Sequence, residues 1–281
     1  MFVTMKFSDH MCCPGMMHAF RCLKKLVSLA DALNRTAIFP RPYEIMSIVN
    51  NDNIPLQKDW SRYITVPVSQ KMPEYEISQT FVSPSTPWKE LLTLQSDMIV
   101  LDFTKKEWKH RESDCFQYKV AKINYSKQVF EPSQLVMQHV MRIKNNMGAF
   151  NMMHVRRGRI LLLKSTTYSH GHCGTQNLRR VTSPSYITDF YNKSPANKSI
   201  PLIIMSNEKD NDFYWELKQK IKNVLFENSL FPEWAKKDQY FIYQTMLHLG
   251  KFAEYKVSTT PSCYLKGGCH RNLCEKQCTC T

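Results

Sequence analysis

Hydrophobic residues along the chain recur in short apolar runs, typical of buried strands, and in longer stretches with the spacing of amphipathic helices. Residues 2–7 have the strand pattern. Residues 16–33 carry apolar side chains at intervals of three and four, which predicts a helix with one buried face. Ala37-Ile38-Phe39-Pro40 follows as a short buried strand. This succession predicts a β-α-β unit, the start of a parallel sheet.

The same alternation returns after a polar, proline-containing stretch at 41–95 that predicts no clear element. The remaining pattern predicts strands at 98–103, 149–155, 201–205 and 257–259, and helices at 133–144, 185–191, 210–225 and 238–253. Asn145-Asn146-Met147-Gly148 interrupts it. We therefore expect an α/β fold with two halves, residues 1–147 and residues 148–281.

The chain has 281 residues and a formal net charge of +14, which favours an anionic partner. Its Lys and Arg residues are dispersed, as on a solvated surface, so nucleic-acid binding is not the favoured interpretation. No apolar run approaches the ~20 residues of a membrane span, and the first residues lack a secretory h-region. These features predict a cytoplasmic protein without membrane insertion.

The absence of a secretory pattern predicts that the 10 cysteines are reduced. A terminal group consists of Cys269, Cys274, Cys278 and Cys280, with His270 among them. Its spacing matches no standard zinc module, so zinc, a local disulfide and free thiols all stay open.

The sharpest motif is the strand that ends in His154-Val155-Arg156-Arg157. Ligands of parallel α/β sheets bind at the carboxyl ends of the strands, and the planar arginine fork suits two phosphate oxygens. Alternation along a strand places His154 and Arg156 on one face. We predict that Arg156 binds phosphate and that His154 supports it; the alternative is a solvated basic turn.

Polar residues also end the later strands. Ser206 and Asn207 can bind a nucleobase or ribose, or can cap the helix that follows. The stretch after the last strand contains Ser262 and Cys263, suited to an anion, and Tyr264, suited to cover a base or sugar.

The loop after the first strand, residues 8–15, contains the candidate general bases Asp9 and His10. A base at this position would take the proton of an acceptor hydroxyl. The alternative for Asp9 is a structural one, in which its carboxylate accepts hydrogen bonds from the loop's own N–H groups.

In this order the motifs resemble the O-fucosyltransferase and alpha-1,6-fucosyltransferase superfamily. Residues 33–40, Leu-Asn-Arg-Thr-Ala-Ile-Phe-Pro, resemble the family's first helix end and strand. Residues 154–159 resemble its His-x-Arg-Arg-x-Asp signature, and 205–207 and 262–264 resemble its two later motifs. The resemblance covers the first 45 residues and most of 130–265.

The resemblance implies a GT-B architecture, with two Rossmann-like domains facing each other across a cleft. Residues 1–147 would form the acceptor-side domain and residues 148–281 the nucleotide-sugar-binding domain. It also implies an inverting glycosyltransferase that needs no metal or other cofactor. Arg156 would hold the diphosphate and stabilise the charge of the leaving group. Ser262 and Cys263 would contact the phosphates, and Tyr264 the base or sugar.

Two departures leave the donor open between GDP-fucose and another nucleotide sugar such as UDP-xylose. Arg159 stands where the family signature has an acid, and the first loop lacks the family's Gly-rich pattern. The acceptor would be a hydroxyl of a glycan or glycoprotein. In lacking secretory features, the sequence resembles bacterial-type or large-DNA-virus members of the family.

Two other function classes stay open. The runner-up, motivated by the net charge and the cysteine-rich tail, is a basic, zinc-binding protein that binds nucleic acid. Cys173, flanked by His170 and His172, has the residue types of a cysteine enzyme.

Overall fold

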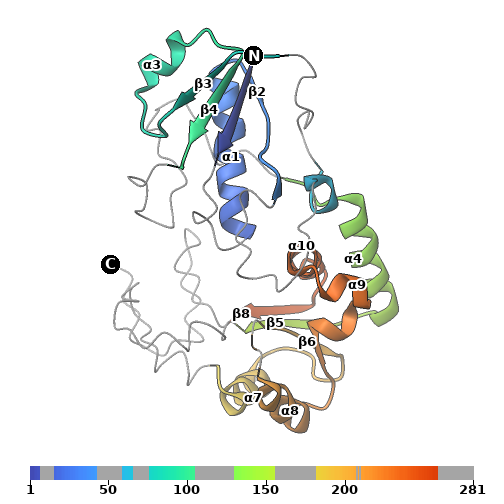
Figure 1. Cartoon of the computed structure of the whole chain (residues 1–281). Coiled ribbons are helices and arrows are strands. Elements are labelled where there is room, and N and C mark those ends of the chain that lie inside the picture. The colour runs from blue at the N-terminus through green and yellow to red at the C-terminus, as the bar shows by residue number, and fades with distance from the viewer. Residues whose placement is uncertain are drawn as a thin grey trace, which may run out of the picture. The chain divides into compact units, whose positions relative to one another are not determined.

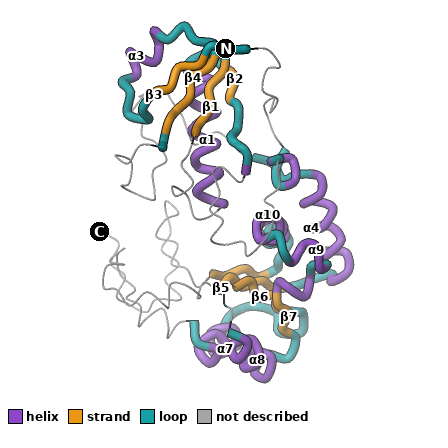
Figure 2. The backbone as a smooth tube through the Cα atoms, in the orientation of Figure 1, coloured by secondary structure: helices purple, strands orange, loops and turns teal. Residues whose placement is uncertain are grey.

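The computed structural model describes residues 1–6, 16–42, 59–65, 76–104, 130–155, 182–206, 208 and 210–258, without the side chains of 16–19 and 21. The chain divides into two compact units, Met1–Met137 with Lys237–Gln244, and Gln138–Lys236 with Thr245–Thr281. Each unit contains a four-stranded parallel sheet with helices beside it (Figures 1 and 2). The predicted α/β class with two parallel sheets is confirmed.

The sheet of the first unit has the order β2-β1-β4-β3. Its strands are β1 (Phe2–Lys6), β2 (Thr36–Ala37), β3 (Gln79–Val82) and β4 (Met98–Asp102), all parallel. Its helical elements are α1 (Met16–Ala32), η2 (Trp60–Arg62) and α3 (Trp88–Thr93). Helix α1 connects β1 to β2, so the predicted β-α-β unit is confirmed. Strand β3 and helix α3 lie in the stretch for which the pattern predicted no element.

The sheet of the second unit has the order β7-β6-β5-β8. Its strands are β5 (Asn151–Val155), β6 (Leu202–Ser206), β7 (Val224–Phe226) and β8 (Tyr255–Ser258), all parallel. The later helical elements are α4 (Gln134–Met147), α7 (Pro184–Lys193), α8 (Asn211–Lys220), η4 (Glu227–Leu230), α9 (Glu233–Lys236) and α10 (Gln239–Leu249). The chain passes between the two units three times, within α4, directly after α9 and within α10. The sequence placed the boundary after residue 147, at the end of α4.

Alternation along β5 decides which side chains enter the core. Met153 and Val155 are buried in a cluster with Ile187 of α7 and Leu217 of α8. That side of the sheet is therefore covered by α7 and α8, which lie next to each other in Figure 1. His154 belongs to the opposite face, as the sequence predicted.

The prediction of one helix over 210–225 is wrong after Lys220. Ile221 has extended backbone, and Val224-Leu225-Phe226 forms strand β7. The apolar spacing of Leu217, Ile221 and Val224 suits a helix, but pairing with β6 satisfies the backbone of this segment instead, with Leu202 opposite Val224. Residue 227 is consequently at the end of a strand.

Cys22 is fully buried on α1 and is disulfide-bonded, so the expectation of reduced thiols is wrong at this residue. The expectation came from a rule about compartments, which does not consider which cysteines a fold brings together. The other nine cysteines, including the terminal group, lie outside the described residues. Among the helices of the described part, none has the length and apolar character needed to cross a membrane.

Candidate functional site

The candidate site is the carboxyl edge of the sheet in the second unit. Its strands are parallel, so they all end at this edge, where α/β proteins bind ligands. The strand ends bring His154 of β5, Ser206 of β6 and Ser258 of β8 to one edge, and Glu227 follows β7 directly. Of the residues predicted from sequence, His154 and Ser206 are in the described part of the chain.

His154 is half-buried, and its position is fixed from the neighbouring strand. Its Nδ1 lies 3.1 Å from Oγ of Ser258, the residue paired with it in the register of β5 and β8. This hydrogen bond restrains the imidazole ring two residues before Arg156, for which strand alternation predicts the same face. Ser258 belongs to a segment singled out in the sequence, but its role as partner of His154 depends on strand register, which no local pattern reveals.

Ser206 is buried and lies on the other face of the sheet. It pairs with Val155, whereas His154 pairs with Met205, and paired residues of parallel strands share a face. Its Oγ accepts a hydrogen bond from the backbone N–H of Glu208 at 3.2 Å, which closes the turn after β6. The two predicted residues thus reach the edge from opposite sides of the sheet.

The alternative in which Ser206 or Asn207 caps the next helix is wrong for Ser206. The N-cap of α8 is Asp210, whose carboxylate accepts a hydrogen bond from the backbone N–H of Asp212 at 3.0 Å. The cap is worth about 1 kcal/mol to the helix and does not involve the strand end. The side chain of Ser206 holds the turn instead.

Glu227 is a site residue that the sequence analysis missed. It is half-buried, and burial raises the pKa of its carboxyl to about 8, while the backbone N–H of Ser206 donates to the carboxylate and acts in the opposite direction. Near neutral pH the carboxyl is therefore largely protonated and can donate a hydrogen bond. The sequence does contain a signal for this residue, the apolar run Val224-Leu225-Phe226 followed directly by an acid. The predicted helix over 210–225 concealed it.

Substitution of Glu227 by Gln is expected to change how stability depends on pH. The folded-state pKa of about 8 exceeds the ordinary 4.5. The carboxyl's contribution to the free energy of unfolding is therefore fully present below pH 4.5 and is lost as the pH rises toward 8. At about 1.4 kcal/mol per pKa unit, the loss amounts to a few kcal/mol. Urea unfolding between pH 5 and 9 should show this slope in the native protein and a flatter profile in Glu227→Gln. An unchanged slope, or equal flattening by the exposed control Glu254→Gln, would contradict the assignment.

The other predicted site residues lie outside the described residues, and their roles stay predictions. They are Asp9, His10, Arg156, Asn207, Ser262, Cys263 and Tyr264. The covalent chain places Arg156 directly after Val155, the buried last residue of β5. Within the described ranges, no three His, Cys, Asp or Glu side chains are grouped in a way that could hold a metal ion.

Comparisons with solved structures give a distant likeness. No family model and no curated protein matches the chain. The crystal structure of POFUT1 in complex with GDP aligns with a TM-score of 0.42 at 10% identity, covering 92% of this chain and 98% of that chain. POFUT1 in complex with GDP-fucose aligns with a TM-score of 0.38 at 11% identity, covering 92% and 96%. Values this low assign neither an activity nor a donor to this chain.

The described edge combines an imidazole, two hydroxyls and a carboxyl of raised pKa. Two arginines follow β5 in the sequence. Arginine supplies charge and paired donors for phosphate oxygens, whereas neutral hydroxyl and carboxyl groups suit the hydroxyls of a sugar or ribose. The edge is therefore chemically suited to a polar ligand that carries phosphate.

Proposed function

We propose that the protein is an inverting glycosyltransferase that moves a sugar from a nucleotide-diphosphate donor to a hydroxyl of a glycan or glycoprotein. The observation that carries the proposal is the end of β5. There His154 is fixed by Ser258 at the carboxyl edge of a parallel sheet, and Arg156-Arg157 follow Val155, the last residue of the strand. A restrained residue before a pair of arginines at a strand end supports a diphosphate site.

In the proposed reaction Asp9 or His10 takes the proton of the acceptor hydroxyl as its oxygen attacks the anomeric carbon of the donor. The bond from that carbon to the diphosphate breaks, and the leaving group takes the bonding electrons. Arg156 stabilises the charge that develops on the diphosphate, an interaction that is stronger in the transition state than in the ground state. No metal is needed for this step, because the guanidinium supplies the positive charge.

The remaining predicted residues would contact different parts of the donor. Ser262 and Cys263 would contact the phosphates, and Tyr264 the base or sugar. Ser206 and Asn207 would contact the ribose or nucleobase, with Glu227 beside Ser206 as a further hydrogen-bonding group. GDP-fucose and UDP-xylose are the two donors that we put first.

Thermal denaturation with GDP, UDP and CMP tests the donor site. We expect one nucleoside diphosphate to raise the melting temperature, since a ligand at 100 times its Kd stabilises the folded state by about 2.7 kcal/mol. The matching free nucleoside is the control and should have a much smaller effect, because it lacks the diphosphate. The proposal fails if no nucleotide stabilises the protein at millimolar concentration. Slow hydrolysis of one member of a nucleotide-sugar panel would then identify the sugar. Measuring this hydrolysis with and without EDTA tests whether a metal is needed.

A further inference from the structure

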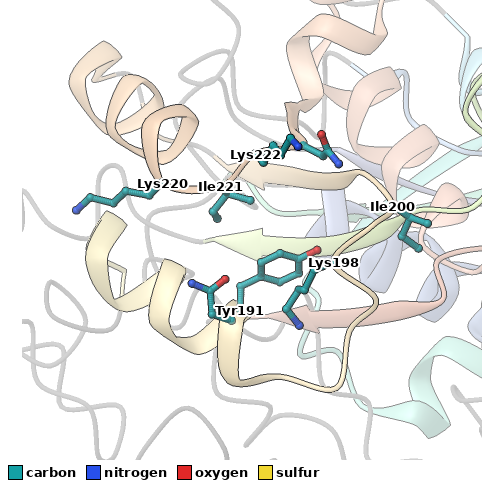
Figure 3. Close-up of a pocket in the computed structure, with 8 residues that line it drawn as sticks. Tyr191, Lys198, Ile200, Lys220, Ile221 and Lys222 are labelled. Carbon is teal, nitrogen blue, oxygen red and sulfur yellow. The ribbon is translucent and has the colours of Figure 1, made fainter.

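A separate hollow lies at the opposite, amino edge of the same sheet. It has a volume of about 310 Å³ and is lined by residues that precede β6 and β7, including Ile200 and Ile221 (Figure 3). This volume falls at the lower end of the range for small-molecule sites. Strand β6 has five residues, so the two edges are about 13 Å apart. The hollow therefore does not belong to the site proposed for the donor.

Lys198 is a positioned cation in this hollow. Its Nζ donates to the backbone oxygens of Ser194 and Ala196 at 2.8 and 2.7 Å and to Oγ of Ser194 at 3.2 Å. The same ammonium lies 4.6 Å from the centre of the Tyr191 ring, and Figure 3 shows the two side chains next to each other. Burial lowers the pKa of Lys198. These contacts hold a positive charge in place at the wall.

Tyr191 supplies a donor beside this charge. Its hydroxyl accepts a hydrogen bond from Nδ2 of Asn151 at 3.1 Å, and its own proton has no acceptor among the described residues. Burial raises the pKa of Tyr191, so the hydroxyl keeps this proton at neutral pH. Asn151 is fully buried, and its Oδ1 has no hydrogen-bond partner in the described part of the chain. Of these groups only Tyr191 lines the hollow, and its hydroxyl proton is the donor that is unused next to the fixed charge.

Lys222 adds a second positive charge, and within the described ranges its ammonium makes no hydrogen bond or ion pair. Lys220 also lines the hollow, but its ammonium points away from Tyr191 and donates to Oγ of Ser185 at 2.7 Å. No Asp or Glu is among the described lining residues. The ammonium of Lys220 lies 3.8 Å from the carboxylate of Glu216, which compensates its charge. Lys198 and Lys222 have no such carboxylate partner among the described residues, and their positive charge favours an anion.

We propose that this hollow binds the phosphate group of a small molecule, with Lys198 as fixed charge and Lys222 and Tyr191 as donors. The proposal does not depend on the glycosyltransferase assignment. Two sources share this chemistry, inorganic phosphate and a phosphate ester of a sugar. The ester differs from inorganic phosphate by its sugar, which would have to contact the wall of the hollow to add affinity.

Calorimetric titration of the full chain with inorganic phosphate and with a hexose 6-phosphate, at constant ionic strength, tests the proposal. Lys222→Met should weaken binding about tenfold, as expected for one lost hydrogen bond to a charged group. Tyr191→Phe keeps the ring and should weaken binding severalfold. Lys218→Met is the matched control and should leave it unchanged, since Lys218 is an exposed lysine of α8 that lies over Phe226, outside the hollow.

Tighter binding of the hexose phosphate would identify an ester as ligand, and equal affinity would identify inorganic phosphate. The proposal is overturned if neither ligand binds, or if Lys218→Met weakens binding as much as Lys222→Met. Saturating nucleoside diphosphate provides the last control. Complete displacement of phosphate by the nucleotide would place phosphate at the carboxyl edge and would also overturn the proposal, whereas undisturbed binding supports a separate site.

Discussion

Arg156→Ala is expected to lower kcat by about 10²- to 10³-fold, equivalent to ~3–4 kcal/mol of transition-state stabilisation. The guanidinium would act on charge that appears as the diphosphate leaves, so its loss should affect turnover more than ground-state binding. The measurement is transfer, or slow donor hydrolysis, with the donor found in the panel. The melting temperature without ligand should stay unchanged, because Arg156 follows the buried part of β5 rather than lying within it.

The neighbouring arginine provides a matched control for this experiment. Alternation places Arg157 on the face of Val155, which is buried against α7 and α8, whereas Arg156 shares the face of His154. Arg157→Ala should therefore reduce turnover less than Arg156→Ala. Arg156→Lys keeps the positive charge but loses the paired N–H donors of the guanidinium, so it should recover part of the activity. Full activity in Arg156→Ala, or an equal loss in Arg157→Ala, would remove the role assigned to Arg156.

The sequence predicted the fold where local patterns decide the structure. The apolar spacing of residues 16–33 corresponds to α1, and the run at 98–103 corresponds to the buried strand β4. Alternation correctly separated His154 from the core residues Met153 and Val155. These features depend on neighbours within one or two turns of chain, which is why they can be predicted from sequence.

The prediction failed where distant pairing decides the structure. The segment after Lys220 became β7 because β6 supplies a partner, although its apolar spacing also suits a helix. The same error concealed Glu227, whose raised pKa depends on burial beside Ser206. The pairing of His154 with Ser258 depends on register between strands far apart in sequence. The carboxyl edge could thus be predicted, but not all of the groups that meet there.

A second large effect is expected at a buried ion pair in the first unit. Asp238 is 4% exposed, and its Oδ2 accepts from Nε of Arg62 at 2.7 Å. Its Oδ1 accepts from the backbone N–H of Phe241 at 3.0 Å, within the first turn of α10. The hydroxyl of Tyr63 donates to the same carboxylate at 3.3 Å. One side chain thus neutralises an arginine, caps a helix and satisfies a buried phenol.

The two phenols near Asp238 cannot substitute for its carboxylate. Burial, followed by the charge of Asp238, raises the pKa of Tyr63 and raises that of Tyr240 to about 12. Both phenols therefore stay protonated and neutral at any pH the protein meets, and neither can replace the negative charge. Removing the carboxylate leaves Arg62 without this counter-charge and Tyr63 without its acceptor.

Asp238→Ala is accordingly expected to destabilise the protein by about 3–5 kcal/mol, the range for removing one partner of a buried pair. Urea unfolding followed by tryptophan fluorescence measures the effect, and Trp60, which is fully buried and lies beside Tyr63, contributes to this signal. Glu233→Ala is the control, because it breaks an ion pair with Lys236 in which the glutamate side chain is 85% exposed. That change should cost less than about 1 kcal/mol.

The double variant Arg62→Met/Asp238→Leu separates the charge from the packing. Apolar residues in place of a buried ion pair are often neutral in stability, so the double variant should recover much of what Asp238→Ala loses. Recovery should be incomplete, because leucine cannot accept the hydrogen bond from Phe241 N–H that caps α10. If Asp238→Ala costs no more than the exposed control, the carboxylate does not hold Arg62, Tyr63 and α10 together. If the double variant is the less stable of the two, the charge pair itself contributes net stability.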